Sequence, residues 1–203
     1  MMRTLPERLV TTHLQMASQK QLQPVYLESA RRSRCRMIRL ENVDVDYYRF
    51  LYGAVGGPWS WTDRLRESAR QGIRSDLASP DFSLDLFYEA GAPAGLMEIM
   101  REEADFEIVY FGLRPAFHGR GLGKHFLASG VQRAWDEGAQ RVWLHTCNLD
   151  GPHAMSNYLK RGFEVFRVDE DPMPPWLRPD GSLIETLRPT SADVRVTWRH
   201  LRQ

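Results

Sequence analysis

The sequence is poor in cysteine, carries almost no net charge and contains no long apolar run. Its two cysteines, Cys35 and Cys147, form no CxxC pair or metal-spaced cluster, which argues against a disulfide scaffold and a metal site. Because 27 Lys and Arg are balanced by 26 Asp and Glu, we expect neither a nucleic acid nor a membrane surface as partner. No window reaches the roughly 20 apolar residues that cross a bilayer, and the N-terminus lacks the apolar run of a signal peptide. These absences predict a cytoplasmic protein that binds any anion through local groups.

The chain also lacks a Pro/Gly/Ser-rich linker or a shift in composition, so we expect a single domain over 1–203. Alternating apolar segments and segments with apolar residues at helical spacing predict an α/β sandwich with a mixed sheet and, in its second half, parallel connections through helices. The proline-rich tail, 171–203, is irregular until "VRVTW" (194–198), which would add an edge strand or contact a second subunit in a homodimer. Strands are expected at 8–18, 105–113, 141–147 and 163–168, a hairpin at 82–102, and helices at 44–57, 58–72, 122–138 and 152–162, while 29–43 is ambiguous.

Two adjoining helices are predicted in the first half of the chain. The helix at 44–57 has Asp44 or Asp46 as its cap, and Tyr47, Phe50 and Leu51 at helical spacing predict its buried stripe. The helix at 58–72 is predicted from a capping box at 60–63 and from a glycine at its end. Between them lies the turn "GGPWSW" (56–61).

The stretch "HGRGLGK" (118–124) follows a predicted strand and opens a predicted helix. It is not a dinucleotide fingerprint, because Lys124 stands where the third glycine is needed, and not a P-loop, because His118 and His125 stand at its glycine and Ser/Thr positions. The remaining interpretations are an anion cradle at a helix N-terminus and a glycine turn without a ligand. Arg114, Arg120 and Lys124 would add positive charge to a cradle.

The order strand, "HGRGLG", helix, strand, helix, "YLKRGF" resembles the GNAT superfamily of acyl-CoA-dependent N-acyltransferases. Gly121 and Gly123 match the glycines of the family's Arg/Gln-x-x-Gly-x-Gly/Ala signature. The segment "AMSNYLKRGFEVF" matches the second half of the signature, with Tyr158 four residues before Gly162. The resemblance covers 106–166, and the residues before this core fit the family by the order of elements only.

The chain departs from the family pattern at two positions. His118 stands where Gln or Arg is usual, which the resemblance tolerates because loop amides do most of the work on the pyrophosphate. Gly151 stands where an asparagine that contacts the pantetheine arm is frequent. Asn148 and Asp150 are the two alternatives for that contact.

The resemblance implies a fold, an activity and a cofactor. The fold would be a mixed sheet of six or seven strands flanked by about four helices, with the fourth and fifth strands, "FEIVYFGL" and "RVWLHTC", splayed apart. The activity would be direct transfer of an acetyl group from acetyl-CoA to a primary amine of a small molecule or protein, without a metal. The implied cofactor-binding residues are Phe111, Gly112, Leu113, His118, Gly119, Arg120, Gly121, Leu122, Gly123, Lys124 and Asn148.

Acetyl transfer needs a group that accepts the proton of the amine and a group that protonates the departing thiolate. The resemblance places Tyr158 beside the sulfur as the general acid, and the other interpretation is a core aromatic. It places Glu107 as the general base, with Glu98 as the second candidate, although either would also suit the solvent face of a strand. His145 would relay a proton or be a core histidine, and Cys147 is expected to be a buried small side chain.

The aromatic segment "YYRFLYGAVGGPWSW" (47–61) lies in the region that walls the acceptor site in the family. Aromatic rings suit an amine or its carbon skeleton. The predicted acceptor-binding residues are Tyr48, Tyr52, Trp59, Trp61, Tyr110 and His145. The sequence leaves open a non-catalytic acyl-CoA-binding or regulatory module and a transferase of a longer acyl group.

Overall fold

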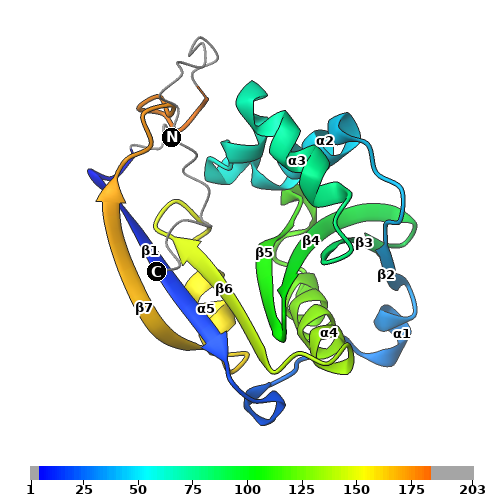
Figure 1. Cartoon of the computed structure of the whole chain (residues 1–203). Helices are drawn as coiled ribbons and strands as arrows, with labels where there is room; N and C mark the ends of the chain where they lie inside the picture. Colours follow the sequence, from blue (N-terminus) through cyan, green and yellow to red (C-terminus); the bar gives the residue numbers. More distant parts are fainter. Residues whose placement is uncertain (1–4, 184–203) are drawn as a thin grey trace.

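The computed structural model describes residues 5–183 and contains one open sheet of seven strands flanked by helices (Figure 1). The predicted mixed sheet is confirmed, and the ambiguous segment forms α1 and β2. The strands lie in the order β2-β3-β4-β5-β6-β1-β7. In the chain the elements are β1 (Arg8–Met16), α1 (Ser29–Arg32), β2 (Cys35–Arg39), α2 (Val45–Gly56), α3 (Arg70–Leu77), β3 (Phe82–Glu89), β4 (Ala92–Glu102), β5 (Asp105–Leu113), α4 (Leu122–Asp136), β6 (Arg141–Cys147), α5 (Ala154–Leu159) and β7 (Glu164–Pro172).

β1, the first strand of the chain, is an inner strand of the sheet and lies between β6 and β7. β1 pairs antiparallel with β6, from Thr11 opposite Cys147 to Met16 opposite Val142, and it pairs antiparallel with β7 on its other edge. The predicted parallel connection is therefore present between β5 and β6, through α4, but β7 does not pair with β6. The start of β1 consequently lies beside the end of β6, where the candidate site is found.

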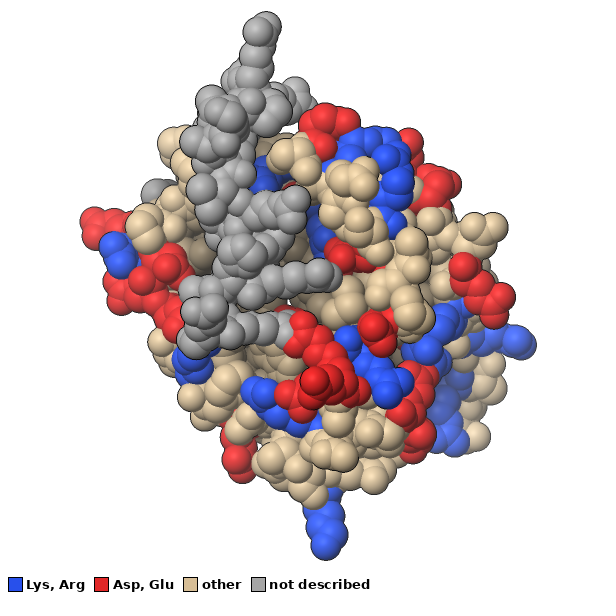
Figure 2. All heavy atoms as spheres, viewed as in Figure 1, with Lys and Arg blue, Asp and Glu red and all other residues tan. Residues whose placement is uncertain are grey.

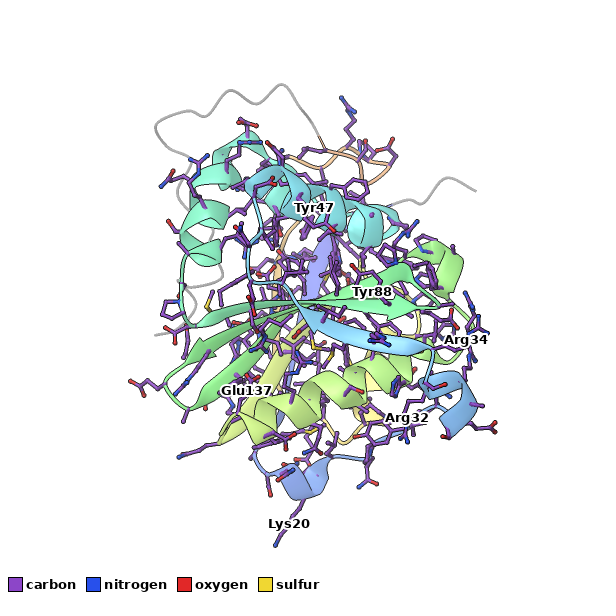
Figure 3. All side chains as sticks on the ribbon, turned by 90° about the vertical axis from the view of Figure 1, so that its right-hand side faces the viewer. Lys20, Arg32, Arg34, Tyr47, Tyr88 and Glu137 are labelled. Carbon is purple, nitrogen blue, oxygen red and sulfur yellow. The ribbon has the colours of Figure 1, made fainter. Side chains whose placement is uncertain are left out.

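Helices cover both faces of the central strands, with α2 and α3 on one side and α4 on the other (Figure 3). Because both faces of β4 are covered by helices, neighbouring residues of this strand are both apolar. Leu96 packs in the cluster under α2 and α3, while its neighbour Met97 packs under α4. α4 approaches closely because Gly130 faces Met97, where a Cβ would lie 2.2 Å from the sulfur. This packing fixes α4, and with it the loop at its N-terminus, against the sheet.

β5 and β6 diverge halfway along their length. They pair only from Asp105 opposite Arg141 to Ile108 opposite Leu144, although both strands continue beyond these residues. On its other edge β5 shifts register against β4 between Ile108 and Tyr110, which places a bulge at Val109. A bulge bends and twists a strand, so it accounts for the bending of β5 away from β6. The expected splay is present at these two strands, which are the fifth and sixth in the chain.

α2 begins as predicted but buries a different stripe. The carboxylate of Asp44 caps the helix by accepting from the backbone N–H groups of 46 and 47. Tyr47 and Phe50, predicted to be buried, are 41% and 67% exposed. Leu51 is buried as predicted, and the other members of the buried stripe are Tyr48, Tyr52 and Val55.

The helix predicted at 58–72 is wrong. Three short 3-10 turns occupy 57–69, and α3 begins at Arg70 and continues through Gly72. Ser60, the predicted N-cap, has a left-handed backbone with φ of 60° and instead ends the 3-10 turn at 57–59. Packing explains the difference, because Trp61 folds back onto Gly56, where a Cβ would lie 2.3 Å from the indole.

A buried ion network joins the 57–69 segment to the sheet. The carboxylate of Glu98 is fully buried, accepts from Arg64 at 2.8 Å and also accepts from the Tyr48 hydroxyl. The same arginine pairs with Asp76 of α3 at 2.6 Å. Burial raises the pKa of Glu98, with Arg64 and Tyr48 acting in the opposite direction. This contact set is typical of a structural anchor.

Removing one partner of this network is expected to destabilise the fold strongly. Arg64→Gln leaves the buried Glu98 carboxylate without its cation, which should lower the free energy of unfolding by about 3–5 kcal/mol. The double variant Arg64→Met/Glu98→Gln removes both charges and should lose less. Urea denaturation of the three proteins measures the difference; equal losses for the single and double variants would contradict a coupled pair.

The described surface carries both signs of charge. Basic and acidic side chains are interspersed over the face shown in Figure 2. No helix within residues 5–183 is long and apolar enough to span a bilayer. The predicted strand "VRVTW" lies outside the described residues.

Candidate active site

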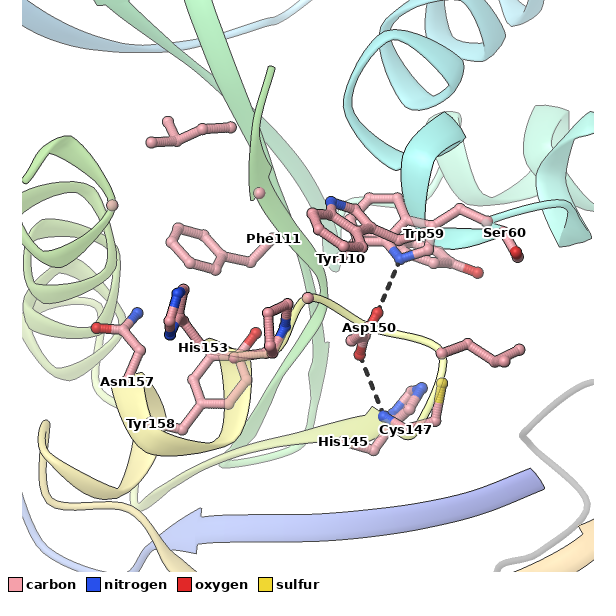
Figure 4. A pocket seen from close by; sticks show the side chains of 18 of the residues that line it. Trp59, Ser60, Tyr110, Phe111, His145, Cys147, Asp150, His153, Asn157 and Tyr158 are labelled. Atoms are coloured by element: carbon pink, nitrogen blue, oxygen red, sulfur yellow. Dashed lines mark hydrogen bonds between the residues drawn. The ribbon is translucent and has the colours of Figure 1, made fainter. Parts of the chain in front are cut away.

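A cavity of about 1030 Å³ opens where β5 and β6 diverge (Figure 4). One end is lined by the glycine loop before α4, and the floor by the last residues of β5 and β6. α5 and the loop before it line one side, and the 59–63 turn lines another. The cavity therefore joins the predicted cofactor loop, the splay and part of the predicted acceptor wall in one continuous space.

The glycine loop has the geometry of an anion cradle. Gly119 and Gly121 have φ of 70° and 73°, left-handed conformations that other residues adopt only with strain. Gly121 is the N-cap of α4, a 15-residue helix without an acidic residue in its first turn. Its first N–H groups and the positive end of its dipole therefore face the cavity without a competing side-chain carboxylate in that turn.

The three cations predicted around the loop differ in their contacts. Arg120 forms an ion pair with the buried carboxylate of Glu89 on β3. Arg114 donates to the carbonyl of Pro93 at 2.8 Å. Lys124, on the first turn of α4, is the one of these three that lines the cavity and could meet a ligand there.

Tyr158 of α5 lines the cavity beside the splay (Figure 4). Its side chain is buried, and its ring packs edge-on against Phe111 of β5 and Phe163. Burial raises the pKa of the phenol well above its ordinary value, and Asp150 and Cys147 raise it further. The hydroxyl is therefore protonated at neutral pH and able to donate.

Glu107 and His145 face each other across the paired ends of β5 and β6. Nδ1 of His145 lies 3.3 Å from Oε1 of Glu107. The histidine lines the cavity, whereas the glutamate is buried behind it. The imidazole is therefore placed to take up a proton at the cavity, with the buried carboxylate holding its orientation.

Asn148 and Asp150, the two alternatives for a contact with the pantetheine arm, differ in their surroundings. Asn148 accepts from Val10 N–H at 3.1 Å and donates to Arg8 C=O at 2.9 Å, so its amide is bound to β1 and does not line the cavity. Asp150 does line the cavity. The structure thus separates Asn148 from the other predicted cofactor residues because β1 occupies the adjoining position in the sheet.

The acceptor wall is aromatic. Trp61 and Tyr110 pack with ring centroids 5.1 Å apart, and Tyr52 contacts both rings from α2. Trp59 lies beside them in the cavity lining (Figure 4). Tyr48 lies behind this layer, where it stacks on Tyr52 and binds Glu98.

Cys147 lines the cavity but is not set up as a nucleophile. Burial raises the pKa of its thiol to about 12, with Asp150 adding to the effect, so the reactive thiolate is scarce at neutral pH. On the acetyl transfer that the resemblance implies, Cys147→Ser should therefore retain turnover within about threefold, and intact mass analysis of the wild type after incubation with acetyl-CoA should show no acetylated protein. A turnover loss of about 100-fold together with an acetylated wild-type protein would contradict this expectation.

The cavity brings together most of the residues predicted from sequence and adds others, among them Asp63. The sequence predicts Asp63 as the second residue of a capping box; its residue type and spacing give no signal that it lines the cavity, because the turn that carries it forms only through packing. Predicted residues outside the lining are Tyr48, Glu98, Glu107, Arg120 and Asn148. Those within it are Tyr52, Trp59, Trp61, Tyr110, Phe111, Gly112, Leu113, His118, Gly119, Gly121, Leu122, Gly123, Lys124, His145 and Tyr158.

An open sheet splayed at a glycine cradle, with a buried tyrosine beside the splay, is the arrangement that the resemblance to the GNAT superfamily implies. Residues 39–163, more than half of the chain, match the acetyltransferase (GNAT) family. The chain belongs to this family, whose members bind acyl-CoA. No curated protein matches the sequence. Within residues 5–183, no group of three or more His, Cys, Asp or Glu is arranged to hold a metal ion.

Solved structures share the fold at low sequence identity. A conserved protein of unknown function from Staphylococcus epidermidis has a TM-score of 0.58 and 17% identity, with 79% of this chain and 59% of that chain covered. A GCN5-related N-acetyltransferase from Sphaerobacter thermophilus has a TM-score of 0.52 and 19% identity over 81% and 50%. A Bacillus subtilis acetyltransferase in complex with CoA has a TM-score of 0.51 and 18% identity over 66% and 78%. This chain therefore spans less than two thirds of the length of the first two proteins.

Proposed function

We propose that this protein is an N-acetyltransferase that moves an acetyl group from acetyl-CoA to a primary amine by direct attack in a ternary complex. The observation that carries the proposal is the single cavity in which the glycine cradle, the splay of β5 and β6 and Tyr158 meet. The family membership and the CoA bound to the Bacillus subtilis neighbour support the choice of cofactor.

Successive parts of the cavity lining would contact successive parts of acetyl-CoA. Loop amides at 119–123 and Lys124 would hold the pyrophosphate. The backbone of 111–113, which pairs with β4 on one edge and diverges from β6 on the other, would align the pantetheine arm and the thioester carbonyl. Tyr158 would then lie beside the sulfur.

In the chemical step the amine nitrogen forms a bond to the thioester carbon, and the carbon–sulfur bond breaks as the tetrahedral intermediate collapses. The proton that the amine loses passes to His145, and the carboxylate of Glu107 stabilises the imidazolium that results. Tyr158 donates its proton to the departing thiolate. The aromatic rings at 52, 59, 61 and 110 would hold the carbon skeleton of the acceptor.

The assignment of Glu107 predicts a specific kinetic loss. Glu107→Gln keeps the shape of the side chain but removes the charge that stabilises the protonated His145, so kcat should fall about 100-fold while the Kd of CoA stays the same. Glu137→Gln, a surface change at the end of α4, is the control. Equal kcat values for Glu107→Gln and wild type would show that the carboxylate takes no part in proton transfer.

Binding of the cofactor is tested by the thermal midpoint of unfolding. Acetyl-CoA at 100 times its Kd should stabilise the folded protein by about 2.7 kcal/mol, which for a chain of this size corresponds to about 5–10 °C. No shift at millimolar acetyl-CoA would refute the proposed function.

A further inference from the structure

Trp59 contacts both sides of the splayed cavity. Its indole stacks on the imidazole of His118, with ring centroids 6.2 Å apart and planes inclined by 25°. On the other side, a Cβ on Gly151 would lie 3.3 Å from two indole carbons, so the ring rests on the glycine backbone. His118 follows β5 and Gly151 follows β6, so one side chain of the acceptor wall links the ends of the two diverging strands.

His118 is held in the orientation that this stacking needs. Its Nε2–H donates to the carbonyl of Leu113, the last residue of β5, at 2.7 Å. The residue also begins the glycine loop, directly before Gly119. A ligand bound by the loop amides restricts the backbone that carries His118, and the stacked ring extends that restriction to Trp59.

The neighbouring tryptophan is attached to the same two-residue segment of the β6 loop. Trp61 Nε1–H donates to one carboxylate oxygen of Asp150 at 3.1 Å. The other oxygen accepts from Thr146 Oγ1 at 2.6 Å and from the backbone N–H of Cys147 at 3.1 Å. Asp150 thus anchors the turn on the β6 side, while the link from the turn to the glycine loop passes through Trp59.

From these contacts we infer that His118 and Gly151 are positioning residues for the acceptor wall, because they hold Trp59 in place. Through Trp59, ligand binding at the glycine loop and formation of the aromatic wall stabilise each other. The inference rests on the proposed function, since it takes the loop as the coenzyme A site. One stacked aromatic contact changes an equilibrium by a factor of about 2–10, so the coupling should be of that size. It must also be reciprocal: a formed wall raises the affinity for CoA by the same factor.

The same inference accounts for both departures from the family signature. His118 and Gly151 are the two residues on which Trp59 rests. A side chain at 151 would meet the indole at a distance that requires it to shift. Loss of the imidazole at 118 would remove the ring on which the indole stacks.

Hydrogen–deuterium exchange with CoA as the probe tests this coupling without knowledge of the acceptor. In the wild type, CoA should slow amide exchange both at 119–124 and at 57–63, the latter about 2–10-fold. His118→Ala and Gly151→Ala should keep the protection at 119–124 but lose it at 57–63. His118→Phe, which keeps a ring for stacking, should retain both. Tyr26→Ala, which removes a ring that packs on His125 of α4, is the matched control and should behave like the wild type.

The outcomes separate this inference from the proposed function. If CoA protects neither segment in the wild type, the proposed function fails and the inference fails with it. If CoA protects 119–124 but not 57–63, or protects 57–63 equally in both alanine variants, the inference alone is overturned. Should His118→Ala fail to bind CoA, Gly151→Ala decides, because it leaves the glycine loop unchanged.

Discussion

Replacement of Gly121 by valine is expected to weaken CoA binding by at least about 100-fold. The φ of 73° at this N-cap disfavours a β-branched residue, so the loop must rearrange and turn its amides away from the ligand. Two lost hydrogen bonds to a charged phosphate, at about 1.5–3 kcal/mol each, account for a loss of this size. Isothermal titration with CoA measures it.

Gly138→Val is the matched control for this variant. Gly138 also has a positive φ, 95°, with no atom within 4 Å of a built Cβ, but it lies after the C-terminal end of α4. Both variants should therefore lose comparable stability from backbone strain, about 1–2 kcal/mol. If Gly138→Val weakened CoA binding as much as Gly121→Val, general damage to α4 would explain the result and the cradle would lose its support.

Tyr158→Phe should lower kcat by about 100- to 1000-fold while leaving the Kd of CoA within about twofold. The ring and its contacts with Phe111 and Phe163 remain, and only the proton donor is lost. Steady-state kinetics and CoA titration on the same preparation separate the two effects.

Tyr47→Phe removes a hydroxyl from an exposed ring of α2 and should change neither quantity. A Tyr158→Phe variant with normal kcat would show that another group protonates the thiolate. A parallel loss of CoA affinity would instead assign the hydroxyl to binding.

The parts of the site built from consecutive residues could be predicted from the sequence. The glycine loop and the start of α4 follow from the residue pattern of one strand-loop-helix run, and the position of Tyr158 on α5 follows from the resemblance to the family; all three line the cavity. The loop conformation could be predicted because a left-handed glycine before a helix is a local property of the chain.

The parts that depend on distant contacts were harder to predict. The helix at 58–72 is wrong because Trp61 packs on Gly56 and donates to Asp150, and these contacts override local helix signals. The stripe of α2 differs because Tyr48 donates to Glu98 and Tyr52 packs on Tyr110, both from the sheet. Glu98 has the residue type of a base, but its partners come from α2 and the 57–69 segment. Asn148 bonds to a strand about 140 residues earlier, and no local pattern indicates that pairing.

The most direct test of the proposed function is the release of CoA thiol from acetyl-CoA in the presence of a panel of amines, with wild type and Tyr158→Phe run side by side. The panel should include aromatic amines, polyamines, amino acids, an aminoglycoside and peptides with a free lysine or N-terminus. The account predicts release above the rate of acetyl-CoA hydrolysis with at least one amine, and its loss in Tyr158→Phe. Binding of acetyl-CoA without thiol release by any amine would contradict it and identify the protein as a binding module.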